Sequence, residues 1–166
     1  FLAEVDHGAA PFWITDSRTP IWTANIAYAM RLFRDDPQLR FDTRYNREGV
    51  DIGGGEDAVM LRALLARHAR IRYRPDMAVW HSVDAWKLRR RYFLKLHHRA
   101  GVRTGKYELP GYPRTVLGMP PFLLSQFATH GLRAIRMHLL RQPGALRQAM
   151  NAAHALGCLQ GYRGRP

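Results

Sequence analysis

Five stretches of the chain are predicted to be helical from their helix-forming residues and, in most of them, apolar side chains at helical spacing. They are residues 25–33, 56–68, 85–99, 122–141 and 145–156. Apolar residues at intervals of three and four form the stripe that a surface helix buries against its core. Strong breakers punctuate the series, since Asp35-Asp36-Pro37 follows the first stretch and Pro143-Gly144 separates the last two. The pattern therefore predicts several short helices joined by loops.

Two further stretches carry strand patterns. Residues 70–74, RIRYR, alternate polar and apolar side chains, and residues 77–81, MAVWH, form a short apolar strand that ends on His81. Residues 1–24 show no clear period and are predicted to be loop with short strands. Residues 100–121 contain four glycines and four prolines, a composition that resists regular structure. We expect this segment to be the clearest boundary in the chain.

The helix predicted over residues 122–141 has two different faces. One face is apolar and consists of Leu124, Ala128, Leu132, Ile135 and Leu139. The opposite face consists of Gln126, His130, Arg133, Met137 and Arg141. An apolar face opposite a basic one is typical of a helix that lies in a membrane interface. Packing against the rest of the same domain gives the same pattern, so the sequence leaves both possibilities open.

The composition is that of a folded protein. The 166 residues, 46% of them hydrophobic, suffice for one domain with a core. The single cysteine, Cys158, excludes an intrachain disulfide, and no Cys/His cluster has the spacing of a zinc site. No apolar run approaches the roughly 18 residues that a membrane-spanning helix needs. We therefore expect a cytoplasmic protein and, because Phe1 replaces a start methionine, a piece of a longer chain.

Charge is divided unevenly along the chain. Residues 1–57 carry 6 Lys/Arg and 10 Asp/Glu, a net −4, whereas residues 58–166 carry 20 and 3, a net +17. A half this basic attracts nucleic acid, an anionic membrane surface or a phosphorylated small molecule, and Coulomb attraction alone does not distinguish them. Within it, Arg89, Arg90 and Arg91 could grip phosphates or simply form a solvated helix face.

The motif GGGED, residues 53–57, places three glycines before two carboxylates at the start of a predicted helix. Glycine allows backbone angles and a close approach of ligand that a side chain blocks. Glu56 and Asp57 fall at the positive end of the helix, where a carboxylate stays ionised and can act as a general base. The alternative is a tight turn followed by an ordinary helix cap. His81 is a further candidate for ligand, metal or phosphate contact, although a lone histidine is more often structural.

Six short segments follow one another in a distinctive order: T-A-N-I-A-Y (23–28), F-D (41–42), G-G-G-E-D (53–57), L-R (61–62), R-I-R-Y-R-P (70–75) and V-W-H (79–81). This series resembles the C-terminal half of family 2 glycosyltransferases. That family has a G-x-N-x-A-like segment, an F-D pair, a G-E-D acid motif that opens a helix and a W-H that ends a strand, in this order. The resemblance covers residues 23 to about 105 well and the basic tail more loosely.

The resemblance implies an α/β fold, the C-terminal half of an A-type glycosyltransferase with a mixed sheet and flanking helices, followed by amphipathic C-terminal helices. Residues 1–105 would be the acceptor-side part of the catalytic domain, residues 106–121 a Gly/Pro-rich linker and residues 122–166 a basic helical tail. The family's nucleotide-binding half and its Asp-x-Asp metal motif have no counterpart here. This piece alone is therefore expected to be inactive.

The resemblance also implies roles for the acidic motif. Asp57 would be the base that takes the proton of the acceptor hydroxyl, and Glu56 would help to shape the acceptor site. The hydroxyl would displace the nucleoside diphosphate of a nucleotide-sugar donor with inversion. Asn25 would lie near the donor sugar, and Gly54 and Gly55 would let sugar and backbone approach each other.

Cations complete the implied site. His81 would lie near a divalent metal, Mg²⁺ or Mn²⁺, whose main ligands are expected in the missing half, and Arg89, Arg90 and Arg91 could meet the diphosphate or an anionic acceptor. One departure from the family is that Tyr28 begins the segment that replaces its usual arginine pair.

The implied partners are a nucleotide sugar and a saccharide or lipid-linked acceptor of the kind used in the synthesis of cell-envelope polysaccharides. Peripheral contact with the inner face of an anionic membrane is also implied, and no nucleic acid is expected.

The alternative is a noncatalytic basic module that binds nucleic acid or an anionic membrane surface. This alternative gives no reason for the acidic Gly-rich motif. A third interpretation is a scaffold whose carboxylates only cap helices.

Overall fold

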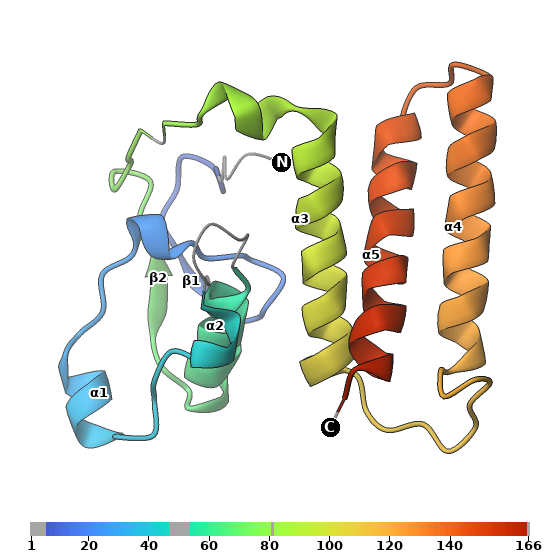
Figure 1. Ribbon diagram of the computed structural model, residues 1–166. Helices are drawn as coiled ribbons and strands as arrows, with labels where there is room; N and C mark the ends of the chain where they lie inside the picture. Colours follow the sequence, from blue (N-terminus) through green and yellow to red (C-terminus); the bar gives the residue numbers. More distant parts are fainter. Residues whose placement is uncertain (1–5, 47–53, 81, 166) are drawn as a thin grey trace. The chain divides into compact units, whose positions relative to one another are not determined.

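The computed structural model describes residues 6–46, 54–80 and 82–165 (Figure 1). The chain divides into two compact units, and the described residues before Asp84 belong to the first while those from Asp84 onward belong to the second. The first unit contains a small sheet with helices, and the second is helical. The α/β transferase fold and the functional division at residue 105 stay predictions.

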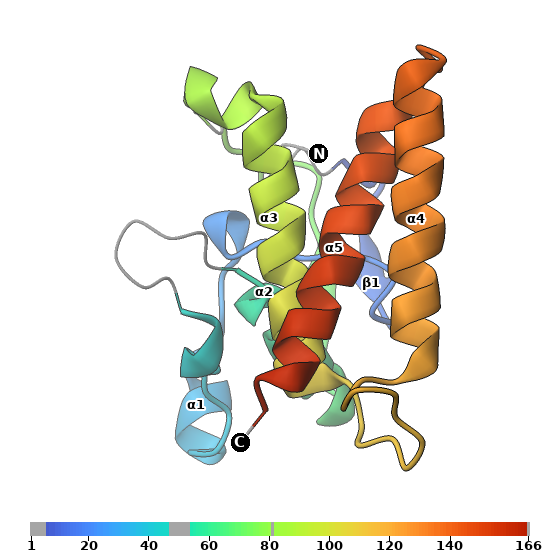
Figure 2. The ribbon, with the colours of Figure 1, turned by 45° about the vertical axis from the view of Figure 1, so that its right-hand side comes forward.

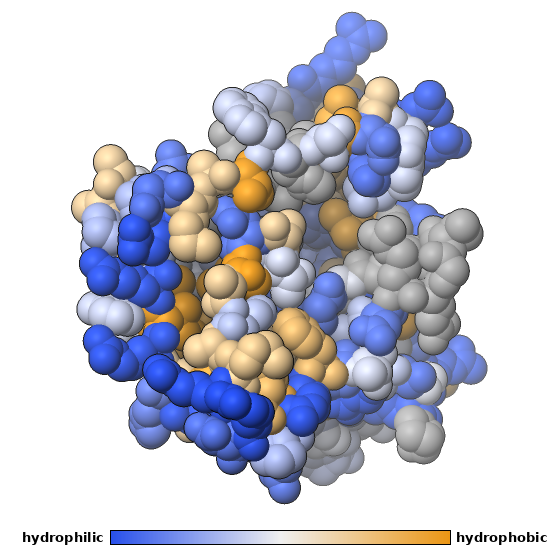
Figure 3. Space-filling view, turned by 90° about the vertical axis from the view of Figure 1, so that its left-hand side faces the viewer, coloured by the Kyte–Doolittle hydropathy of each residue, from blue (hydrophilic) through white to orange (hydrophobic). Residues whose placement is uncertain are grey.

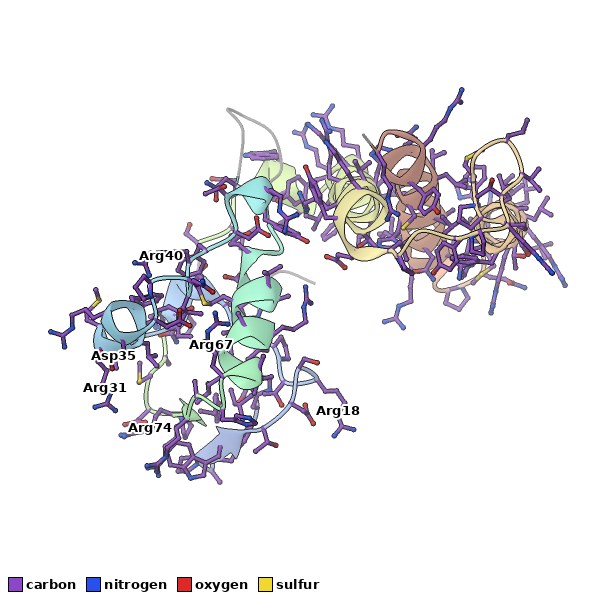
Figure 4. All side chains as sticks on the ribbon, turned by 90° about the horizontal axis from the view of Figure 1, so that it is seen from below. Arg18, Arg31, Asp35, Arg40, Arg67 and Arg74 are labelled. Carbon is purple, nitrogen blue, oxygen red and sulfur yellow. The ribbon has the colours of Figure 1, made fainter. Side chains whose placement is uncertain are left out.

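The first unit is built around the helix that follows the glycines. Its elements are β1 (Phe12–Ile14), η1 (Thr23–Asn25), α1 (Arg31–Asp35), η2 (Thr43–Tyr45), α2 (Glu56–Ala66) and β2 (Ile71–Tyr73). The two strands pair antiparallel, with Trp13 opposite Arg72. Met60 and Leu64 of α2 are buried with Leu39, because the apolar stripe faces the core. Arg67, labelled in Figure 4, follows α2 directly. It forms an ion pair with Asp36, which follows α1.

The sequence predictions for this unit are partly confirmed. Helix α2 and strand β2 lie where the periodicity predicts them. The predicted helix over residues 25–33 is wrong, because η1 ends at Asn25 and the chain is extended at Ile26 before α1 begins. The side chain of Asn25 is engaged elsewhere and does not cap a helix. The predicted strand over residues 77–81 is also wrong for its described residues, which form no strand.

The second unit is a set of three helices. Its elements are η3 (Ala85–Leu88), α3 (Arg90–Arg103), a π-helical turn η4 (Thr104–Glu108), α4 (Pro121–Leu139) and α5 (Ala145–Arg163). In Figures 1 and 2 α5 lies between α3 and α4. Helices α3 and α5 run parallel, and α4 runs antiparallel to both. Helix α4 therefore carries the chain back to the end of the unit at which α3 begins, so that α5 can run parallel to α3.

Four glycines bring α3 and α5 into backbone contact. A Cβ placed on Gly101, Gly105, Gly157 or Gly161 would lie 2.0, 2.2, 2.1 or 2.0 Å from the carbonyl oxygen of His154, Cys158, His98 or Val102, respectively. Real Cβ atoms do not approach a carbonyl oxygen this closely, so only glycine fits. The glycines are spaced Gly-x-x-x-Gly on each helix, the arrangement that lets two helices pack backbone to backbone.

This contact explains where the helix predictions are wrong. Residues 100–108 were predicted to be irregular, but α3 and η4 continue through them. The last helix was predicted to end near Leu156, but α5 reaches Arg163. In both places the low intrinsic helix propensity of glycine predicts the end of a helix. The close approach of the opposite helix more than offsets the low helix propensity of glycine here.

Arg165 fixes the end of the second unit. Its guanidinium donates to the carbonyl oxygens of Gly105 at 2.8 Å, of Pro110 at 3.1 Å and of Leu109. It also lies over the ring of Tyr162, with Cζ 4.2 Å from the centroid. A cation beside the free carbonyls at a helix C-terminus is favourable, because these groups carry the negative end of the helix dipole. Arg165 thus joins the end of η4 to the end of α5.

We expect Gly157→Ala to lower the free energy of unfolding by about 1–3 kcal/mol or more, because the new methyl group forces α3 and α5 apart. Gly131→Ala is the matched control, since a Cβ on Gly131 in α4 meets nothing within 4 Å. That substitution should stabilise the protein by up to about 1 kcal/mol through helix propensity. Urea unfolding followed by circular dichroism measures both, and equal effects would contradict the glycine contact.

Two histidines are packed between the helices of this unit. Burial lowers the pKa of His97 on α3, and it lowers the pKa of His154 on α5, where the charge of His97 adds to the effect and Glu108 opposes it. His154 also contacts the buried thiol of Cys158, with Nδ1 and Sγ 3.6 Å apart. The folded unit therefore favours neutral imidazoles at these positions.

We expect the stability of the protein to fall as the pH is lowered below about 6.5, the ordinary histidine pKa, because the unfolded chain then binds protons that His97 and His154 do not. Above about pH 7 both states are neutral at these rings, and this contribution should be flat. Chemical unfolding at several pH values measures the slope. His154→Gln should reduce it, whereas His138→Gln, on an exposed position of α4, should not. A slope that is unchanged in His154→Gln would contradict the assignment.

Candidate functional site

The start of α2 presents the acidic motif. Gly54 and Gly55 have φ angles of 124° and 104°, in the left-handed region that favours glycine. The chain turns there into α2, whose first two residues are Glu56 and Asp57. The Asp57 carboxylate accepts a hydrogen bond from the backbone N–H of Thr23 through Oδ1, at 3.1 Å. Asp57 therefore joins α2 to η1. The alternative interpretation, in which this carboxylate only caps α2, does not include such a contact.

A second hydrogen bond brings a third segment to the same place. The side-chain amide of Asn25 donates from Nδ2 to the carbonyl oxygen of Met77, at 2.7 Å. Thr23 and Asn25 both belong to η1, so this short turn contacts the acidic motif on one side and the segment that leads to Trp80 on the other. Three of the motifs noted in the sequence, which are far apart along the chain, thus lie together in the first unit.

Two buried polar atoms near Asp57 lack partners. Neither Oε2 of Glu56 nor the hydroxyl of Tyr28 has a hydrogen-bond partner among the described residues. Burial raises the pKa of Tyr28, and the negative charge of Asp57 raises it further, so the phenol stays protonated close to that carboxylate. A buried polar group without a partner costs about 1–3 kcal/mol, and such groups call for an explanation such as a ligand.

Tyr28 is a candidate that the sequence analysis did not select. It was noted only as a departure from the family pattern. The available signal was its position three residues after Asn25 in the same motif. Its place beside Asp57 follows from the extended chain between η1 and α1, which packs its ring against Phe33 and Phe41.

Asp57 differs from most other aspartates of the first unit. Asp16, Asp36, Asp42 and Asp76 each form an ion pair with an arginine: Arg18, Arg67, Arg44 and Arg74, respectively. Hydrogen bonds from these arginines hold the pKa of each carboxyl below its usual range. Figure 4 labels Arg18, Arg67 and Arg74 on the first unit. Among the described residues no arginine or lysine forms an ion pair with Asp57, whose carboxylate accepts the hydrogen bond from Thr23.

The surface around the first unit carries large apolar side chains. Trp80, which precedes the predicted site residue His81 in the sequence, is fully exposed, and Met30 and Val79 are exposed as well. Figure 3, seen from the side of α1 and β2, shows apolar side chains among hydrophilic ones on this unit. Trp13 is covered in part by Arg70, whose Cζ lies 4.6 Å from the ring centroid.

The remaining predicted site residues lie outside the described residues or in the second unit. His81 and Gly53 lie outside the described residues. Arg89, Arg90 and Arg91 are exposed at the beginning of α3, in the second unit. Three arginines at the positive end of a helix repel that end of the dipole, which favours an anion beside them.

The described residues contain no group of three or more His, Cys, Asp or Glu side chains that could hold a metal ion. The divalent cation that the resemblance implies therefore has no set of ligands in the part of the chain that the structure describes. Within that part, no helix has both the length and the apolar character that crossing a membrane requires.

The chain was compared with protein-family models, curated proteins and solved structures, and nothing matched in any of the three.

We expect Tyr28→Phe to leave the free energy of unfolding unchanged or to raise it by up to about 1–3 kcal/mol, because it removes a buried hydroxyl that has no partner. Tyr73→Phe is the control, since the Tyr73 hydroxyl donates to the carbonyl oxygen of Gly8 at 3.1 Å and its removal should lower the free energy of unfolding by about 0.5–1.5 kcal/mol. Urea unfolding monitored by circular dichroism measures both variants. A marked loss of stability in Tyr28→Phe would mean that the hydroxyl has a partner in the free protein.

Proposed function

We propose that this chain supplies the acceptor side of an inverting glycosyltransferase that resembles family 2 enzymes. The observation that supports the proposal best is the meeting of the T-A-N turn, the G-G-E-D helix start and the segment before Trp80 through the hydrogen bonds of Asp57 and Asn25. An unpaired carboxylate held beside buried polar groups is also what a general base for a hydroxyl requires.

In the proposed reaction Asp57 accepts the proton of the acceptor hydroxyl. The hydroxyl oxygen forms a bond to the anomeric carbon of the donor sugar, and the bond from that carbon to the diphosphate oxygen breaks. The electron pair leaves with the nucleoside diphosphate, and attack from the opposite side inverts the anomeric configuration. The unsatisfied oxygen of Glu56 and the hydroxyl of Tyr28 would hold the acceptor by hydrogen bonds, which aligns it for attack.

The leaving diphosphate needs positive charge. Arg89, Arg90 and Arg91 are the proposed source in this chain, for either the diphosphate or an anionic acceptor. A divalent metal would add charge neutralisation when bound, with ligands that the described residues do not supply. We further propose that the protein works peripherally at the inner face of the cell membrane on a saccharide or lipid-linked acceptor.

In a protein that also contains the donor-binding half, Asp57→Asn should lower the transfer rate by about 10²–10⁴-fold, because general-base catalysis contributes that much. Binding of the nucleotide sugar should be nearly unchanged, since the amide oxygen can still accept from Thr23. Asp35→Asn, an exposed aspartate on α1, is the control and should retain full activity. Radiolabelled sugar transfer and calorimetric titration give the two quantities. Unchanged turnover in Asp57→Asn would eliminate Asp57 as the base.

A second candidate function is supported by the charge of the second unit. Residues 84–165 contain 15 Lys/Arg and 2 Asp/Glu, a net +13. A noncatalytic module of this charge would bind nucleic acid with an affinity that falls steeply as salt is added and that does not change in Asp57→Asn. Electrophoretic mobility shifts at two salt concentrations would detect it, and the acidic motif would then need another explanation.

A further inference from the structure

Helix α4 exposes the apolar face that its sequence would be expected to bury. Leu132, Ile135 and Leu139 are 70%, 60% and 74% exposed, and they follow one another at helical spacing. Ala128, one turn earlier on the same face, is also exposed. A soluble helix normally turns such a stripe toward its core. Ala128, Leu132, Ile135 and Leu139 together form the α4 stripe.

The stripe is exposed because α4 packs through another face. Leu123 of α4 is buried in a cluster with Cys158 and Leu159 of α5. Further along, His130 and Gln148 are joined by a hydrogen bond between Nδ1 and Nε2, at 2.7 Å. His130 of the predicted polar face thus contacts α5, whereas Arg133 of the same face is exposed. Leu124, at the beginning of the predicted apolar face, also packs against this cluster. Packing within the second unit therefore accounts for Leu124 but not for the rest of that face, from Ala128 to Leu139.

Arginines border the α4 stripe. Arg133 and Arg136, together with Leu132, Met137 and Gln142, line an open hollow of ≈ 560 Å³ beside it. Neither arginine has an ion-pair partner among the described residues, and the sequence contains no Asp or Glu after Glu108. The positive charge next to the stripe is therefore uncompensated and suits an anionic partner.

We propose that the α4 stripe lies on an anionic lipid bilayer, with its leucines and isoleucine among the acyl chains and Arg133 and Arg136 on the lipid phosphates. A helix of 19 residues is about 28 Å long and would lie in the plane of the interface. Basic side chains beside an apolar stripe are the combination that such helices use, because each term alone binds weakly.

The charge argues against a second copy of the chain as the occupant. Two copies joined through the α4 stripe would bring Arg133 and Arg136 of one beside those of the other, in units that each carry +13. A bilayer offers apolar depth and negative charge together. The inference rests on the proposed location at a membrane but not on sugar transfer, and it specifies which surface makes the contact.

The test is flotation of the whole chain with vesicles of phosphatidylcholine alone and of phosphatidylcholine mixed with phosphatidylglycerol. The chain should float with the mixed vesicles and much less with the neutral ones. Leu132→Gln/Leu139→Gln should weaken binding by at least about tenfold even at low salt, because it removes apolar surface. Arg133→Gln/Arg136→Gln should weaken it by about tenfold or more and reduce its salt dependence.

Lys106→Gln/Arg163→Gln is the matched control, because it removes two exposed charges from η4 and α5 of the same unit and leaves α4 intact. It should bind nearly as the unchanged chain does. Circular dichroism checks the fold of each variant, and Ile135→Gln provides the same test if the double leucine variant does not fold.

Three results would overturn the proposal. They are a chain that does not float with the mixed vesicles, a double leucine variant that binds as well as the unchanged chain, and a dimer in solution that the leucine substitutions dissociate. The second would mean general electrostatic adsorption, and the third a second copy on the stripe. Asp57→Asn should bind vesicles normally, so failure of the membrane proposal and failure of the transferase proposal are distinguishable.

Discussion

Backbone contact between α3 and α5 is the constraint on which the second unit depends. Four glycines allow this approach, and a methyl group at any of them would collide with a carbonyl oxygen of the other helix. With α3 and α5 fixed in this way, α4 is left to pack on the other side of α5. It does so through Leu123 and His130, which leaves its most apolar face outward. The exposed stripe is therefore a consequence of how the helices pack and not a defect in one helix.

Side-chain hydrogen bonds connect distant segments of the first unit. Asp57 and Asn25 each use a side chain to join segments that are distant in the sequence. In the part of the chain that the structure describes, the same arrangement leaves polar atoms of Glu56 and Tyr28 buried without partners. A fold that accepts such a cost at one place commonly does so for function. Together with an aspartate that pairs with no arginine among the described residues, these features support the proposal of a general base beside a hydroxyl-binding site.

The sequence predicted what depends on local pattern. The stripe of α2, the alternation of β2 and the break at Gly144 are all in place. It did not predict the helical glycines, because their role depends on a partner helix more than fifty residues away. The residues of 25–33 have the propensity of a helix, but propensity takes no account of the hydrogen bond from Asn25 to Met77, which lies 52 residues away. Within the candidate site, the acidic motif and Asn25 could be named from the sequence, and η1 contains Asn25 and contacts Asp57. Tyr28 became evident only from its burial near Asp57.

The central claim is that the acidic motif belongs to the acceptor side of a sugar transferase whose donor side precedes it. Reading the coding sequence immediately upstream of Phe1 tests this most directly. The account predicts a segment of alternating strands and helices that contains an Asp-x-Asp after an apolar strand. A start codon directly before Phe1 would leave the protein without a donor site and would contradict the account.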